Sequence, residues 1–129
     1  MRDTENTNSA RILLVDDSEH SRYVVSRILR HAGFHIEESS TGQEGLALAK
    51  KIPDLIIVDV KLPDISGYEV CRRIKSDPDT SYIPVLQISA SFVSSESKVK
   101  ALDGGADAYL THPVDPTVLL ATARALCFA

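Results

Sequence analysis

Three short apolar runs constrain the fold of this chain most. They cover residues 12–15, 55–58 and 85–88, and each is followed at once by an oxygen-bearing side chain: Asp16, Asp59 or Ser89. Aliphatic runs of this length without regular polar alternation are typical of strands buried on both faces, as in a parallel sheet. We therefore expect three central strands, each ending at a polar residue. Two weaker strands are predicted over residues 34–39 and 108–110.

Helical patterns separate the strands. They are predicted over residues 21–32, from a cap at Thr41 to about residue 51, and over residues 67–76, 94–102 and from 116 onward. Thr41 and Glu44 form a capping-box pattern, in which each side chain satisfies a backbone amide at the start of the helix. Asp115 before Pro116 is a second N-terminal signal, with an acidic cap and a proline at the first helical position.

The strands and helices alternate five times along the chain. This order predicts an α/β fold with right-handed crossovers and helices on both faces of the sheet. The common doubly wound arrangement of five parallel strands has the order 2-1-3-4-5, as in flavodoxin-like proteins. A length of 129 residues fits one domain, which we place at residues 11–128 after a flexible lead at residues 1–10.

Composition and charge exclude several classes of protein. No apolar run reaches the roughly 18 residues of a transmembrane helix, and the polar start is unlike a secretory signal. Cys71 and Cys127 are isolated, which fits a reducing compartment and predicts a cytoplasmic domain that needs no membrane. With 14 Lys and Arg against 18 Asp and Glu, the net charge of −4 argues against direct nucleic-acid binding.

Polar residues gather at the predicted carboxyl edge of the sheet, where doubly wound folds place their sites. They are Asp16, Asp17, Asp59, Ser89 and His112. Three converging carboxylates need a neutralising charge, and Mg²⁺ binds such oxygen ligands together with water and phosphate. A carboxylate beside the metal can attack a phosphoryl group and form an aspartyl phosphate.

Simpler interpretations compete with this one. A single acid after a strand is usually a turn former or a cap, and Ser89 alone carries little information. The combination of acids on two strands that flank the switch point favours a site. His20, His31 and His35 lack a ligand spacing, and we assign them to the surface or to helix ends.

Several motifs resemble the receiver domains of response regulators in two-component signalling. Residues 12–18 are similar to the first strand and acidic turn of that family, and residues 59–67 to its phosphoacceptor strand end and following loop. Residues 88–90 resemble its hydroxyl-bearing strand, and residues 105–110 its fifth strand. The resemblance extends from Arg11 to about Phe128.

The resemblance implies roles for the acids. Asp59 would accept a phosphoryl group from a histidine kinase or a histidine phosphotransfer protein. Asp17 would bind Mg²⁺ directly, Asp16 partly through water, and Asp59 and the backbone carbonyl of Lys61 would complete the protein ligands.

The resemblance also implies a switch. Ser89, together with Ala90, would contact the phosphoryl group, and Tyr109 would turn inward when Ser89 moves. Lys61 and Ser91 stand two residues beyond Asp59 and Ser89, at positions that tune the lifetime of the acyl phosphate in the family.

One position departs from the family pattern. Where receiver domains usually carry Lys-Pro after the fifth strand, this chain has His112-Pro113, and we expect that peptide bond to be cis. An imidazole is shorter than a lysine side chain and, with an ordinary pKa of ~6.5, is mostly neutral at pH 7. Nearby acids favour the imidazolium and Mg²⁺ opposes it, so the sequence leaves the sign of the pKa shift open. The hypothesis is that Asp59 is still phosphorylated, with altered coupling to the switch.

Three other functions remain to be weighed. A degenerate receiver would act as an interaction module without phosphorylation. An FMN-binding protein would need a Ser, Thr or Gly phosphate loop where this chain has Asp16 and Asp17, and an aspartyl phosphatase would need an acid where it has Lys61. Both enzyme classes therefore fit poorly, and this chain is not expected to be an enzyme.

The chain also suggests larger assemblies. The region 109–116 is similar to receivers joined to sensor modules, so a longer parent could be a hybrid histidine kinase; a phosphatase-type output and a free-standing receiver are alternatives. A homodimer could form through the face of helix 94–102, strand 108–110 and the last helix. The charged residues predicted on that face are Lys98, Lys100, Asp103 and Arg124.

Overall fold

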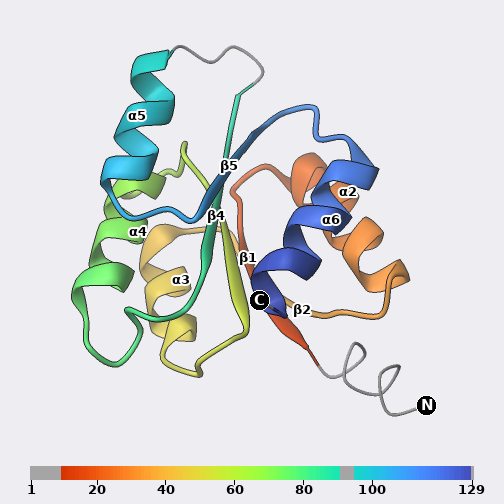
Figure 1. Cartoon of the computed structure of the whole chain (residues 1–129), viewed down its shortest axis with the longest axis horizontal. Helices are drawn as coiled ribbons and strands as arrows, with labels where there is room; N and C mark the ends of the chain where they lie inside the picture. Colours follow the sequence, from red (N-terminus) through yellow and green to blue (C-terminus); the bar gives the residue numbers. More distant parts are fainter. Residues whose placement is uncertain (1–9, 91–94, 129) are drawn as a thin grey trace.

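The computed structural model describes residues 10–90 and 95–128, with the side chains of residues 95–98 left aside (Figure 1). Within these residues, five strands alternate with five helices. The strands are β1 (Arg11–Val15), β2 (His35–Ser39), β3 (Leu55–Asp59), β4 (Val85–Ser89) and β5 (Ala108–Thr111). The helices are α2 (Glu19–His31), α3 (Gly42–Ala49), α4 (Gly67–Ser76), α5 (Ser95–Asp103) and α6 (Pro116–Cys127).

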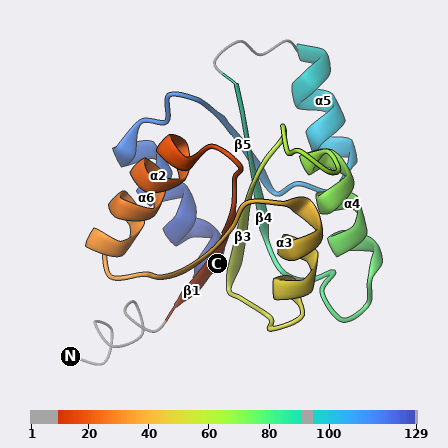
Figure 2. The same cartoon turned by 180° about the vertical axis from the view of Figure 1, so that it is seen from behind.

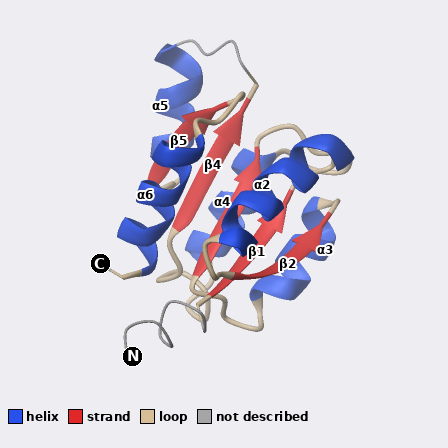
Figure 3. Cartoon of the chain, turned by 90° about the vertical axis from the view of Figure 1, so that its right-hand side faces the viewer, coloured by secondary structure: helices blue, strands red, loops and turns tan. Residues whose placement is uncertain are grey.

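The strands form one parallel sheet in the order β2-β1-β3-β4-β5, which confirms the predicted fold (Figure 3). Helices α2 and α6 cover one face, and α3, α4 and α5 cover the other (Figure 2). The strand order reverses between β1 and β3, so the loops after these two strands diverge to opposite sides and leave a crevice at the carboxyl edge.

The apolar runs are buried on both faces because their side chains alternate between two cores. In β3, Leu55 and Ile57 pack with α2 and α6, while Ile56 and Val58 pack with α3, α4 and α5. This alternation explains why the runs contain so few polar residues. Ala10, predicted to belong to the lead, is buried, and its carbonyl accepts a hydrogen bond from the His35 amide. The rest of that lead lies outside the described residues.

The helix ends follow the predicted caps in part. Asp115 Oδ1 accepts from the amides of Thr117 and Val118, and Thr41 Oγ1 accepts from the Glu44 amide at 3.1 Å. The second half of the capping box, in which the Glu44 side chain accepts from the Thr41 amide, was wrong. The Thr41 amide donates to Ser39 Oγ instead. Helix α2 begins two residues before its predicted start, because Ser18 caps it through the Ser21 amide.

No helix in the described part of the chain is both long enough and apolar enough to span a bilayer.

Candidate functional site

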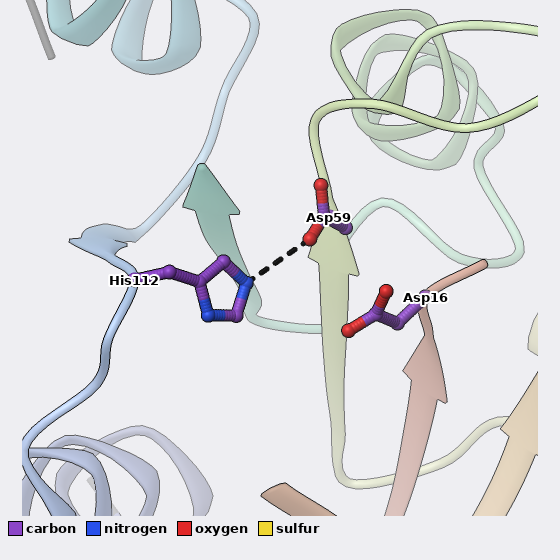
Figure 4. Close-up of side chains that lie close together, drawn as sticks. All are labelled: Asp16, Asp59 and His112. Atoms are coloured by element: carbon purple, nitrogen blue, oxygen red, sulfur yellow. Dashed lines mark hydrogen bonds and ion pairs between the residues drawn. The ribbon is translucent and has the colours of Figure 1, made fainter. Parts of the chain in front are cut away.

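Three side chains from separate parts of the sequence meet at the carboxyl edge of the sheet (Figure 4). Asp16 follows β1, Asp59 is the last residue of β3, and His112 follows β5. One potential ligand atom of each lies within 4.8 Å of the others. The Nε2 atom of His112 lies 3.1 Å from Oδ2 of Asp59. The structure therefore brings together three of the residues that the sequence places at this edge.

Asp16 is a buried carboxylic acid, with only 2% of its surface exposed. Its Oδ1 accepts a hydrogen bond from the Ser18 amide at 2.9 Å. Burial raises the pKa of Asp16 to about 6 despite that bond, and the nearby Asp59 carboxylate adds to the rise. A neighbouring positive charge stabilises a carboxylate most when the carboxylate is shielded from water in this way.

Arg22 supports the turn that carries Asp16. Its Nη1 donates to the backbone carbonyl of Asp16 at 2.7 Å, and its Nε donates to Glu38 on β2 at 3.1 Å. Arg22 therefore ties α2 and β2 to the end of β1. Sequence reasoning missed this role, because an arginine on a helix carries no local signal for a contact with a loop carbonyl.

Asp59 presents one oxygen to the crevice. Its Oδ1 accepts from the Lys61 amide at 2.9 Å, whereas Oδ2 faces His112. The Lys61 side chain is exposed. The backbone bond holds Oδ1, and Oδ2 is left facing the crevice.

Gly67, the first residue of α4, packs directly against the end of β3. A Cβ atom built on Gly67 would lie 2.0 Å from the Asp59 carbonyl oxygen and 2.7 Å from the Val60 Cα. The Gly67 amide donates to the Val60 carbonyl at 2.7 Å. The backbone of Asp59 and the start of α4 are therefore in contact at a distance that only glycine permits.

His112 is held by its backbone and by Asp59. Its amide donates to the Ser89 carbonyl at 2.8 Å, and the His112–Pro113 peptide bond is cis. The hydrogen bond to Asp59 raises the pKa of His112 above its ordinary value, although partial burial opposes the shift. The sequence left the direction of this pKa shift open. The protein's own groups raise the pKa of His112 and so favour the imidazolium form.

The remaining predicted site residues differ in their placement. Ser89 is buried, and its Oγ donates to the carbonyl of the exposed Ala90 at 3.3 Å. Asp17 is exposed, and its carboxylate lies outside the cluster of Asp16, Asp59 and His112. Ser91 lies outside the described residues.

Tyr109 on β5 packs its ring against the core beneath α3, α4 and α5. Its hydroxyl is buried and has no hydrogen-bond partner among the described residues. The aromatic side chain assigned to a switch thus already points inward in this structure, with its polar end unsatisfied.

Replacing Tyr109 by phenylalanine should raise the free energy of unfolding by up to about 1 kcal/mol, because it removes a buried hydroxyl that lacks a partner. Urea denaturation of the two proteins measures the difference. Tyr23→Phe is the matched control, because that tyrosine is 59% exposed and accepts from Arg27. A clear loss of stability in Tyr109→Phe alone would show that the hydroxyl has a partner.

A groove lies beside the cluster, between α2 and the segment after β5. Its volume is about 460 Å³. The groove is mainly apolar, and His112 forms part of its wall. Its lining residues are His20, Ser21, Val24, Val25, Ala90, His112, Pro113 and Val114.

Comparison with known proteins identifies the family and the fold. The sequence profile of the response regulator receiver domain matches residues 12–124. The chain belongs to the response regulator receiver domain family. It is 41% identical over 117 residues to the DNA-binding dual master transcriptional regulator RpaA of Synechocystis, covering 90% of this chain and 48% of RpaA. The chain thus spans about half the length of that relative.

Two further comparisons cover nearly whole proteins. Protein PilH of Pseudomonas aeruginosa is 36% identical over 118 residues, which are 91% of this chain and 97% of PilH. The crystal structure of a putative response regulator from Chloroflexus aurantiacus superposes with a TM-score of 0.89 at 30% identity, covering 93% of this receiver domain and 98% of that chain. The fold of this receiver is thus the fold of solved family members.

Proposed function

We propose that Asp59 accepts a phosphoryl group from a phosphohistidine of a histidine kinase or a histidine phosphotransfer protein. The observation that carries the proposal is the orientation of Asp59. Its Oδ1 is fixed by the Lys61 amide, and its Oδ2 faces the crevice beside the buried Asp16. Membership of the receiver family supports the same role.

The transfer needs an in-line attack. Asp59 Oδ2 attacks the phosphorus, the P–N bond of the donor breaks, and the released imidazole takes up a proton. Before the attack, His112 must release Oδ2, to which it is now hydrogen bonded. Ser89, buried at the end of β4, then donates its hydroxyl to a phosphoryl oxygen.

The acids of the site fit a divalent cation. Asp16 is buried, and its raised pKa shows that nearby positive charge does not offset the cost of burying its carboxylate. It lies with Asp59 in one cluster. Mg²⁺ would be held by Asp16, Asp59 and the Lys61 carbonyl, and by Asp17 once its exposed carboxylate turns towards the cluster. When bound, the ion would neutralise charge on the phosphoryl oxygens.

The groove beside the cluster is the place we propose for the phosphodonor. Val24 and Val114 give it an apolar lining, and His112 connects it to Asp59. A helix that carries the donor histidine would cover the groove and bring its phosphoryl group to Asp59.

Phosphorylation of the purified chain tests the proposal. With Mg²⁺ and a small acyl-phosphate donor, intact-protein mass spectrometry should show the addition of one phosphoryl group. Asp59→Asn should abolish the addition, because the amide lacks the nucleophilic oxygen. Asp79→Asn is the control, since Asp79 is exposed in the loop before β4, at the opposite edge of the sheet. Addition that survives in Asp59→Asn would refute the assignment.

A second candidate function has its own observation. His112 is hydrogen bonded to Oδ2 of Asp59, and a receiver in which this bond persisted would act by interaction alone. In that case, neither phosphorylation nor measurable Mg²⁺ binding would be found.

Several wider predictions remain as proposals. A homodimer would use α5, β5 and α6, where Val99, Leu102 and Val118 are exposed apolar residues. Lys100 on that face lies with its Nζ 5.0 Å from the ring centroid of Tyr68, and Lys98 has no described side chain. Light scattering with and without a phosphodonor tests the dimer.

Two further proposals concern the setting of the domain. The reducing bacterial cytoplasm suits the two free cysteines. A hybrid-kinase parent is tested by sequencing the gene beyond Ala129.

A further inference from the structure

The imidazole of His112 gives the cluster a nitrogen donor. Asp16, Asp59 and His112 each direct one potential ligand atom into a space where all three atoms lie within 4.8 Å of one another. In Figure 4 an oxygen of Asp16 points towards the gap between the His112 ring and Asp59. This set is two carboxylates and one imidazole rather than carboxylates alone.

We propose that Asp16, Asp59 and His112 form a binding site for a divalent transition ion of the Zn²⁺ class, which competes with Mg²⁺ and blocks phosphorylation. The blocking effect rests on the proposed function of Asp59. The binding site itself rests on the three side chains.

The geometry is close to that of a three-ligand site. With metal–ligand bonds of about 2.0–2.2 Å in a tetrahedral arrangement, two ligand atoms are separated by roughly 3.3 Å. His112 Nε2 and Asp59 Oδ2 are already 3.1 Å apart. The remaining separations are at most 4.8 Å, so a shift of about 1.5 Å or less completes the arrangement.

The ligands are held in place by the backbone. Asp16 Oδ1 accepts from the Ser18 amide, and Asp59 Oδ1 accepts from the Lys61 amide. The His112 amide is bound to the Ser89 carbonyl. Each carboxylate therefore keeps its second oxygen for the cluster, and such supporting bonds typically strengthen metal binding.

The chemistry of the donors selects the ion. Mg²⁺ prefers oxygen ligands in octahedral geometry and retains waters, whereas imidazole suits Zn²⁺, Cu²⁺, Ni²⁺ and Fe²⁺. A lysine at position 112 would be protonated and would have no lone pair to offer a metal ion. The histidine thus provides a nitrogen ligand, which releases its proton when it binds a metal, at a position where the chain departs from the usual receiver pattern.

The same atom explains the competition. Asp59 Oδ2 is the oxygen directed at His112 and the oxygen assigned to the attack on phosphorus. An ion bound through Oδ2 and His112 Nε2 would occupy the lone pair that the transfer needs. A bound transition-metal ion would therefore hold the receiver unphosphorylated even when Mg²⁺ is abundant.

Calorimetric titration with Zn²⁺ alone and with Mg²⁺ alone tests the site. Against His112→Ala and His112→Lys, the native chain should bind Zn²⁺ at least about tenfold more tightly, with Mg²⁺ affinity nearly unchanged in His112→Ala. Co²⁺ serves as an optical probe, and its visible absorption should be lost in both variants. His35→Ala is the matched control, because His35 is exposed at the start of β2 on the opposite edge of the sheet.

The outcomes separate this inference from the proposed function. Equal Zn²⁺ affinity in the native chain and in folded His112→Ala, or loss of binding in His35→Ala, would overturn the site. Phosphorylation with Mg²⁺ in chelator-treated buffer would still support the role of Asp59 in that case. If binding depends on His112 but added Zn²⁺ leaves Mg²⁺-dependent phosphorylation unaffected, the competition is overturned.

Discussion

Gly67→Ala should slow phosphorylation of Asp59 by about 100-fold, although position 67 carries no reactive group. The new Cβ would lie 2.0 Å from the Asp59 carbonyl oxygen, and its other close neighbours are also backbone atoms. Backbone cannot rotate out of the way as a side chain can, so the end of β3 or the start of α4 must move by about 1 Å. A displacement of that size at a reacting carboxylate is enough to lose alignment with the phosphorus.

Initial rates of phosphoryl incorporation, with a small acyl-phosphate donor and saturating Mg²⁺, measure the effect. Gly104→Ala is a close control, because the nearest atom to a Cβ there lies at 3.5 Å, an ordinary contact. It should phosphorylate at the native rate. A native rate in folded Gly67→Ala would show that the β3–α4 junction yields without moving Asp59.

Asp16→Asn should make the protein more stable in the presence of EDTA while removing its affinity for Mg²⁺. The carboxylate of Asp16 is buried, and burial raises its pKa to about 6 from 3.8. The folded state therefore binds a proton more readily than the unfolded state between these values. The stability that Asp16 contributes is present below about pH 4 and is lost as the pH rises to 6.

Asparagine carries no charge at any of these pH values, so the loss of stability between pH 4 and 6 should disappear in Asp16→Asn. We expect a gain on the order of 1–2 kcal/mol at pH 7.5, measured by urea denaturation in EDTA, and a flatter profile between pH 4 and 6. Asp79→Asn, at an exposed loop, should retain the native profile. A native profile in Asp16→Asn would mean that the buried carboxylate is stabilised by a group other than those described.

The strand pattern predicted most of the fold. Each apolar run became a strand buried on both faces, because runs of only four residues rich in β-branched side chains favour buried strands over helices. The carboxyl-edge rule then placed Asp16, Asp59 and His112 together, since parallel strands end at a common edge. These predictions depend on local patterns and on topology, which a single sequence contains.

Contacts between residues that are far apart in the chain could not be predicted from the sequence. Asp16 and Asp17 are adjacent and chemically identical, yet only Asp16 turns into the crevice, and the packing at the end of β1 decides between them. The support that Arg22 gives to the Asp16 carbonyl, and the contact of Gly67 with Asp59, join elements far apart in the chain. The sign of the His112 pKa shift needed the distance to Asp59.

The hydrogen bond from the His112 amide to the Ser89 carbonyl, at 2.8 Å, links two residues with different tasks. Ser89 also faces Thr111 in the register of β4 and β5, so the bond continues the pairing of these strands by one step. A shift of the end of β4 would therefore also shift the backbone that carries the His112 side chain. The backbone of position 112 therefore belongs to the same strand pairing that holds Ser89, and a displacement of either backbone is transmitted to the other.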